Sequence, residues 1–319
     1  MSKRVFGVDI GGTTVKLGLF TDTGEVLDKW EIPTRTEDNG KNILPDIAES
    51  IKAKMDENNL SNHNIVGIGM CVPGPVDDLG IVHKAVNLGW GEFNLEGEMK
   101  KYIDLPIIAG NDANVAALGE LWKGGGQGHS NIVVVTLGTG VGGGVIVNGK
   151  ILNGCSGAGG EIGHIHIIDD EEETCGCGNK GCLEQYASAT GITRLAKRRL
   201  QKDDAPSVIR NTPMDEINSK TVFDAVKEGD KVAIEIAEEF GEILGKGLAC
   251  IAGVTNPEIF VIGGGVSKAG EVLLEYVQKN YVKYVFPGSR NAKFALATLG
   301  NDAGIFGSAK LVLDEVKLP

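Results

Sequence analysis

The chain has 319 residues, of which 42% are hydrophobic and 23% are charged. These values are typical of a globular protein and exclude a wholly disordered chain, and the 47 glycines follow no Gly-X-Y period, which excludes collagen. Acidic residues exceed basic ones by 12, so we expect neither nucleic acid nor an anionic membrane as a main partner.

The sequence predicts neither a transmembrane helix nor a signal peptide. No stretch reaches the ~18 apolar residues that span a bilayer, and the apolar run at 5–8 is too short for a signal. Six cysteines in such a chain indicate a reducing compartment, so a cytoplasmic location is predicted. Three of the six lie between Cys175 and Cys182, a spacing that favours a metal site over disulfides.

Short β-like segments and amphipathic helices alternate along the chain, which predicts α/β domains with largely parallel sheets. The opening segment runs strand, Gly/Thr turn, strand, Gly turn and strand, and residues 131–152 repeat this order. We therefore expect two domains, each headed by one copy of the repeat. In chain order, the predicted elements are strands at 5–10, 15–20 and 26–30, a helix at 44–55, strands at 64–70 and 107–109, a helix at 112–122, strands at 132–137, 145–147 and 150–152, a helix at 232–251, a strand at 258–262 and a helix at 271–280.

Two glycine-rich turns are candidates for binding phosphate. The chain lacks a P-loop motif, and residues 138–143, which match Gly-x-Gly-x-x-Gly, lead into a strand rather than the helix of a dinucleotide site. Backbone N–H groups in such turns can bind anions, and Thr13, Thr14 and Thr139 add hydroxyl donors. Asp9, before the first turn, could hold Mg²⁺ through water. The alternative is two ordinary hairpins and a carboxylate at a strand end.

Together with Gly263-Gly264-Gly265, these turns resemble the phosphate and adenosine motifs of the sugar kinase, actin and heat-shock-chaperone superfamily. That superfamily has two ribonuclease-H-like α/β domains with ATP in the cleft between them. With a glycine break at 124–126, the resemblance implies a smaller domain at 1–121, completed by 301–319, and a larger domain at 122–300. The ATP-binding residues that it implies are Asp9, Gly11, Gly12, Thr13, Thr14, Lys16, Gly138, Thr139, Gly140, Gly264 and Gly265.

A cysteine cluster predicts a structural zinc site. Cys175, Cys177 and Cys182 with one histidine make a full tetrahedral ligand set. His164 and His166 would share a face if 163–168 were a strand, so the spacing leaves both as candidates. The acidic run at 169–173 is interpreted as a solvated loop rather than a metal site.

The segment from Glu161 to His164, followed by the run from Cys175 to Glu184, resembles the signature of the ROK sugar kinases and of their sugar-sensing repressor relatives. The resemblance implies that His164, not His166, is the zinc ligand. It also implies that Glu161, His164 and Glu184 face the hydroxyl groups of a sugar.

Asp112 is the candidate catalytic base. It follows a short apolar strand and opens a helix, a position at which Asn and Asp are also ordinary helix caps. Phosphoryl transfer to an alcohol needs a group that accepts the hydroxyl proton. The run from Asn111 to Asn114 resembles the catalytic motif of the ROK kinases, which implies that Asp112 takes this proton and that Asn111 binds neighbouring hydroxyls.

Residues 71–77, 85–90 and 299–304 resemble the glucose-phosphorylating branch of that family. The resemblance implies transfer from Mg-ATP to the 6-hydroxyl of glucose, a homodimer or dimer of dimers, and further sugar contacts at Gly74 and Asn87, for which turn chemistry is the alternative. The alternatives for function are a kinase for N-acetylglucosamine, N-acetylmannosamine, fructose or allose, a polyphosphate donor, or a non-catalytic sugar sensor. The repressor relatives carry an N-terminal helix-turn-helix, for which the position of Asp9 leaves no room.

Overall fold

The computed structural model describes residues 3–77 and 79–316, so the outermost residues of the predicted domain at 1–121 and 301–319 lie outside the described chain. Two compact units divide the chain. The first comprises Met1–Gly128, Gly144–Gly160 and Leu299–Pro319, and the second comprises His129–Gly143 and Glu161–Thr298. Residues 144–160, expected in the larger domain, belong to the first unit.

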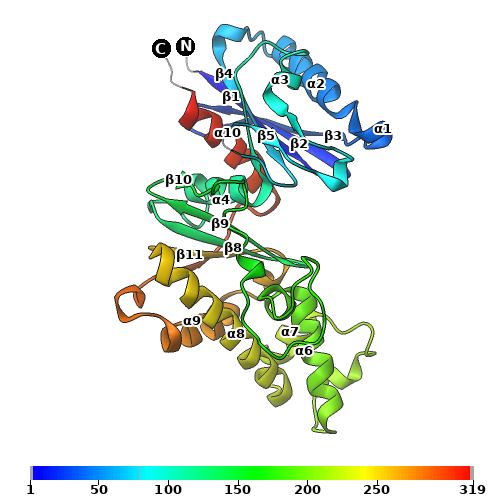
Figure 1. Cartoon of the computed structure of the whole chain (residues 1–319), viewed down its shortest axis with the longest axis vertical. Coiled ribbons are helices and arrows are strands. Elements are labelled where there is room, and N and C mark those ends of the chain that lie inside the picture. Colours follow the sequence, from blue (N-terminus) through cyan, green and yellow to red (C-terminus); the bar gives the residue numbers. More distant parts are fainter. Residues whose placement is uncertain (1–2, 78, 317–319) are drawn as a thin grey trace. The chain divides into compact units, whose positions relative to one another are not determined.

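The first unit is built on a mixed five-stranded sheet with the order β3-β2-β1-β4-β7 (Figure 1). The strands β1, β4 and β7 follow the predicted parallel arrangement, whereas β2 pairs antiparallel with both β1 and β3 through tight turns. The strands are β1 (Arg4–Ile10), β2 (Thr14–Thr21), β3 (Val26–Pro33), β4 (Ile65–Val72) and β7 (Ile107–Asn111), with β5 (Ile81–Val82) and β6 (Phe93–Asn94) in a separate small sheet. The helices are α1 (Glu37–Gly40), α2 (Ile43–Glu57), α3 (Leu95–Met99), α4 (Asp112–Lys123) and α10 (Ala303–Glu315).

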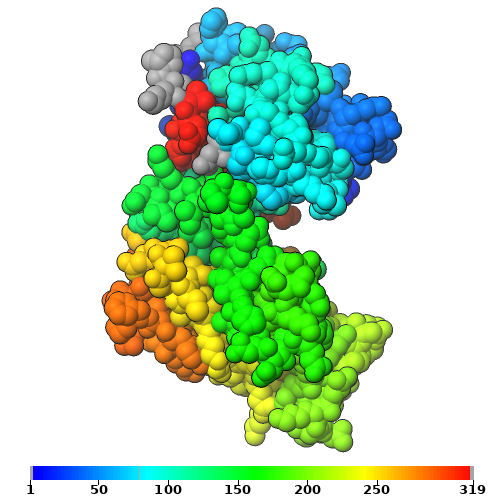
Figure 2. Space-filling view, viewed as in Figure 1, coloured from blue at the N-terminus to red at the C-terminus, as the bar shows by residue number. Residues whose placement is uncertain are grey.

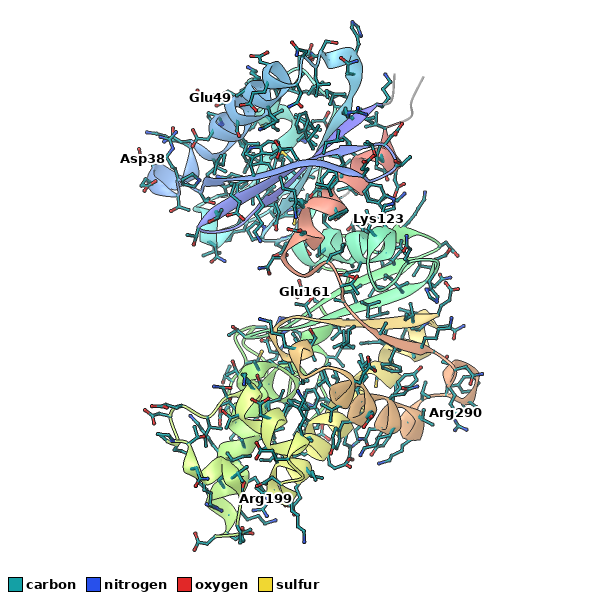
Figure 3. All side chains as sticks on the ribbon, turned by 180° about the vertical axis from the view of Figure 1, so that it is seen from behind. Asp38, Glu49, Lys123, Glu161, Arg199 and Arg290 are labelled. Carbon is teal, nitrogen blue, oxygen red and sulfur yellow. The ribbon has the colours of Figure 1, made fainter. Side chains whose placement is uncertain are left out.

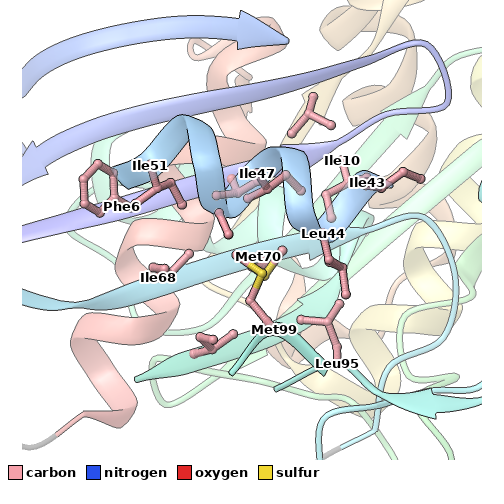
Figure 4. Packing of buried hydrophobic residues seen from close by; sticks show 14 of the residues in the cluster. Phe6, Ile10, Ile43, Leu44, Ile47, Ile51, Ile68, Met70, Leu95 and Met99 are labelled. Carbon is pink, nitrogen blue, oxygen red and sulfur yellow. The ribbon is translucent and has the colours of Figure 1, made fainter. Parts of the chain in front are cut away.

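One face of this sheet is covered by α2 and α3. Side chains alternate across a strand, so Phe6 and Ile10 of β1 point to the same side. They meet Ile47 and Ile51, which lie one turn apart on α2 (Figure 4). Each such fully buried side chain contributes about 1.5–3 kcal/mol to stability. The three- and four-residue spacing of apolar residues in the sequence correctly identified the buried face of α2.

The other face of the sheet is covered by α10, which comes from the far end of the chain. Val5 and Phe20 pack against Ile305. A Cβ on Gly69 of β4 would lie 1.7 Å from the carbonyl oxygen of Ser308, so only glycine lets α10 approach this closely.

The second sheet has the order β10-β9-β8-β11-β12 (Figure 1). If the five strands of each sheet are numbered as they appear along the chain, both sheets have the spatial order 3-2-1-4-5. This shared topology confirms the predicted repeat. Its strands are β8 (Ile132–Leu137), β9 (Val141–Val147), β10 (Lys150–Ile151), β11 (Ile259–Gly263) and β12 (Lys293–Leu296). The helices of the second unit are α5 (Glu184–Ala187), α6 (Ala189–Lys202), α7 (Ser219–Lys227), α8 (Lys231–Thr255) and α9 (Glu271–Tyr284).

The long helix α8 begins after the cap Asp230, whose side chain accepts a hydrogen bond from the N–H of Ala233, and ends at Asn256 in the left-handed conformation. It lies beside α9 at the surface of the unit, where Figure 2 colours the two helices yellow and orange. Among residues 3–77 and 79–316, no helix is long and apolar enough to cross a membrane.

Candidate active site

Asp112 lies where β7 ends and α4 begins. Asn111, not Asp112, caps the helix, since its Oδ1 accepts hydrogen bonds from the N–H groups of Ala113 (3.1 Å) and Asn114 (3.2 Å). The Nδ2 of Asn111 donates to Asp112 Oδ1 (3.0 Å) and to the carbonyl oxygen of Gly74 (3.0 Å). The exposed carboxylate of Asp112 is thus oriented at a helix N-terminus, with Gly74 beside it.

Cys71 lies between Asp9 and Asp112, the two residues with candidate carboxylates. No motif in the sequence marked it as a functional residue. It pairs with Asp9 across β1 and β4, and its Sγ lies 3.9 Å from the backbone oxygen of Asp112. Burial raises the pKa of Asp9, while a hydrogen bond from Cys71 and the charge of Lys16 lower it. Burial, with the charges of Asp9 and Asp112, raises the pKa of the thiol. Cys71 is therefore a protonated donor that supports Asp9.

The first glycine turn is held by Thr34 of the neighbouring segment. Its Oγ1 donates to the carbonyl oxygen of Gly11 (2.7 Å) and its N–H to that of Thr13 (2.9 Å). A Cβ on Gly12 would lie 3.7 Å from the Cβ of Asn87. The structure therefore brings together a predicted phosphate residue and a predicted sugar residue. Thr14 and Lys16 follow on β2, where Lys16 Nζ donates to the backbone oxygen of Asn301 (3.1 Å).

In the second unit, His164, Cys175, Cys177 and Cys182 gather their ligand atoms within 4.8 Å of one another. His164 Nδ1 lies 3.7 Å from Cys175 Sγ, and the Sγ atoms of Cys177 and Cys182 are 3.7 Å apart. Tetrahedral metal–sulfur bonds of about 2.3 Å put ligand atoms roughly 3.8 Å apart. The four residues thus fit a metal ion.

His166 stands outside this cluster. Its ring is bound instead by Asp169 (2.9 Å) and by the backbone oxygen of Lys180 (2.9 Å). The premise of a strand over 163–168 was wrong, because Ile162–His164 forms a 3₁₀ turn. That turn aims the two histidines at different partners.

The predicted sugar residues of the second unit adjoin the cysteines. His164 Nε2 lies 3.8 Å from a carboxylate oxygen of Glu161. The residue Glu161 is labelled in Figure 3. Glu184 opens α5, where its Oε1 accepts from Cys175 Sγ (3.5 Å) and its Oε2 accepts from the N–H of Val141 (3.0 Å). Glu184 therefore joins the cysteine cluster to the second glycine turn.

The nucleotide candidates of the second unit surround that turn. A Cβ on Gly140 would lie 2.0 Å from Glu184 Oε2, and the carbonyl oxygen of Gly138 accepts from the N–H of Ala189 (2.8 Å). Gly264 has a φ of +84°, and a Cβ there would lie 2.4 Å from the carbonyl oxygen of Leu137. Thr139 and Gly265 are the neighbours of these glycines in the chain, so the two predicted nucleotide segments meet at the end of β8.

The acidic run at 169–173 is not wholly solvated, because the side chain of Glu171 is only 1% exposed. The hydroxyl of Tyr186 donates to it, and Arg194 binds it at 2.8 Å. Burial would raise the pKa of Glu171, but hydrogen bonds from Tyr186 and the N–H of Glu173, with the charges of Arg194 and Arg198, lower it to about 2. The loop between the metal-ligand candidates is thereby fastened to α5 and α6.

Glu171→Gln is expected to reduce stability in a pH-dependent way. A carboxyl with a pKa of about 2 when folded and 4.5 when unfolded stabilises the fold fully above pH 4.5, by about 3 kcal/mol, and this stabilisation is lost as the pH falls towards 2. Urea unfolding should show this loss at pH 7 and less than half of it at pH 3. The exposed neighbour Glu172→Gln is the control, and equal losses in the two variants would contradict the role of Glu171.

Comparison with known proteins identifies the family of this chain. The ROK family model matches residues 5–315. A glucokinase of Halalkalibacterium halodurans is 43% identical over 98% of this chain and 96% of its own length. Two solved structures are similar: a ROK hexokinase of Thermus thermophilus (30% identity, TM-score 0.80, 98% of both chains) and a ROK family glucokinase of Streptomyces griseus in complex with glucose and AMPPNP (34% identity, TM-score 0.72, 97% of this chain and 98% of that one). These findings confirm the resemblance drawn from the motifs, and the chain belongs to the ROK family.

Proposed function

We propose that this protein transfers the γ-phosphoryl group of ATP to the 6-hydroxyl of glucose. The observation that carries the proposal is the exposed carboxylate of Asp112, held by Asn111 at the carboxyl end of β7, the sheet edge at which open α/β folds bind ligands. The glucokinase of H. halodurans and the S. griseus complex with glucose and AMPPNP support glucose and ATP as substrates.

In the proposed reaction, Asp112 accepts the proton of the 6-hydroxyl as that oxygen attacks the γ-phosphorus, and ADP leaves with the oxygen that bridged the β- and γ-phosphates. Carboxylates are weak bases near neutral pH, so the proton moves late, after the transferring group has been stabilised. Carboxylates, imidazole and amide groups bind the other hydroxyls of the sugar. The residues proposed for this are Gly74, Asn87 and Asn111 in the first unit and Glu161, His164 and Glu184 in the second.

The nucleotide is proposed to bind through the backbone N–H groups of the glycine turns. Asp9 holds Mg²⁺ through water and Lys16 neutralises phosphate charge. The remaining residues proposed for ATP are Gly11, Gly12, Thr13, Thr14, Gly138, Thr139, Gly140, Gly264 and Gly265.

Zinc is the metal proposed for the cysteine cluster, since three thiolates and one imidazole are typical of structural Zn²⁺. Such an ion would be held by His164 Nδ1 and by Cys175, Cys177 and Cys182, and it would fix the rotamer and tautomer of His164. The Nε2 atom of His164, which lies near Glu161, is then available for a sugar hydroxyl.

The test is a product assay on the purified protein with Mg²⁺, using ATP or polyphosphate as donor and a panel of hexoses that includes the N-acetyl sugars. Glucose 6-phosphate formed from ATP, at a kcat/KM at least tenfold above that of any other hexose, is the expected result. Turnover confined to another hexose would overturn the substrate, and binding of a sugar without any turnover would favour a sensor. The homodimer and the cytoplasmic location stay predictions.

A further inference from the structure

The chain passes between the two units at four points, which follow residues 128, 143, 160 and 298. We call the stretches beside these points the connecting segments. Any force that one unit exerts on the other through the covalent chain passes along them. What holds each connecting segment within the first unit therefore matters for the residues that the first unit contributes to catalysis.

Two connecting segments are bound by one buried carboxylate, Glu120, whose residue is 2% exposed. Its Oε2 accepts the N–H of Gly125 (2.8 Å), shortly before the first crossing point. Its Oε1 accepts the N–H of Leu299 (2.9 Å), the first residue after the last crossing point. A single side chain thus joins segments that are more than 170 residues apart in the chain.

The other two connecting segments are held by the first turns of the same helix. Gly144, directly after the second crossing point, packs so tightly that a Cβ there would lie 2.4 Å from the Cβ of Ala117 and 2.8 Å from the carbonyl oxygen of Ala113. Asn114, which is 1% exposed, donates from Nδ2 to the carbonyl oxygen of Gly159 (3.3 Å), just before the third crossing point.

All four connecting segments are therefore fastened to α4, the helix that begins at Asp112. Figure 3 labels Lys123 at its other end. Glu120 lies eight residues beyond Asp112, or about 12 Å along the axis. A tilt of about 5° around Glu120 displaces Asp112 by about 1 Å, and a misplacement of that size can reduce a rate 100-fold.

We propose that Glu120 and Asn114 are positioning residues, which through α4 fix the base Asp112 relative to the connecting segments. The proposal rests on the phosphoryl transfer proposed above. Neither residue needs to touch a substrate. Glu120 sets the far end of the helix, and Asn114 sets the segment that leads directly into Glu161.

The main test is Glu120→Gln, which keeps the size of the side chain. It replaces one of the two acceptor oxygens by an NH₂ group, which cannot accept a hydrogen bond from the backbone N–H that it faces. Amide exchange at Gly125 or Leu299 should become about tenfold faster, because a hydrogen bond to a charged group is lost. The kcat should fall about tenfold or more.

Asn114→Ala should raise the KM for glucose about fivefold while leaving the KM for ATP unchanged.

Asn280→Ala is the matched control, since it removes the same kind of bond, from a buried amide to the carbonyl oxygen of Tyr276 (2.9 Å), on α9. It should lower the melting temperature without changing kcat or either KM. Asn114→Ala also serves as the second variant, in case Glu120→Gln does not fold.

The outcomes separate this proposal from the proposed function. Normal exchange at both amides in Glu120→Gln, or kinetic constants that match those of Asn280→Ala despite faster exchange, would overturn the positioning role. Failure of the unmodified protein to phosphorylate any hexose would instead overturn the proposed function, and the positioning role would be rejected with it.

Discussion

Asp112→Asn should lower kcat by about 10²- to 10⁴-fold, the range attributed to a positioned general base. Asparagine cannot accept the hydroxyl proton, but its side-chain oxygen can still accept from the N–H of Ala113 and from Asn111 Nδ2, as the carboxylate does. We therefore expect the helix to keep its start and glucose to bind with a Kd within about threefold of the original. Steady-state kinetics and calorimetric titration with glucose provide the two measurements.

The matched control for this prediction is Glu271→Gln. Glu271 is the first residue of α9, as Asp112 is of α4, and both are exposed acids at a helix N-terminus. Any effect of losing a negative charge at a helix end appears in both variants. If Asp112→Asn retains a third or more of the original kcat, the carboxylate is not the base.

Cys182→Ser should abolish stoichiometric metal binding and strongly destabilise the second unit. Cys182 is buried, and its thiol faces that of Cys177 at 3.7 Å. Because the folded site exists only when its ligands are together, the free energy of metal binding adds to that of folding. We expect a loss of at least about 4 kcal/mol, a size that single substitutions reach when a metal site is lost. Elemental analysis of the purified protein and chemical unfolding measure the two effects.

Cys250→Ser is the control for this variant, because Cys250 is an exposed thiol on α8 of the same unit. It should keep both metal content and stability. A full equivalent of zinc in Cys182→Ser, with unchanged unfolding, would contradict the proposed ligand set.

Local patterns in the sequence predicted those parts of the molecule that depend on neighbours in the chain. The spacing in α2, the glycine turns and the Cys175–Cys182 run are such cases, and each lies where it was expected. The start of α4 was also expected, although the capping role falls to Asn111 rather than Asp112.

Features that depend on distant segments were not predictable in this way. Glu171 reads as part of an acidic run, and only the approach of α6 with Arg194 and Arg198 buries it. Cys71 gains its position from pairing between β1 and β4. The role of Glu120 depends on Leu299, whose position no local pattern encodes.

The packing of α10 on the first sheet has a consequence for synthesis of the protein. The hydroxyl of Ser308 binds the carbonyl oxygen of Val8 across 300 positions in the chain. A ribosome that adds 5–20 residues per second takes roughly 15–60 s to make that interval. During this time Val5 and Phe20 lack the apolar contacts that α10 later provides. One face of the sheet that is translated first is thus covered last, and its apolar side chains are exposed longest during synthesis.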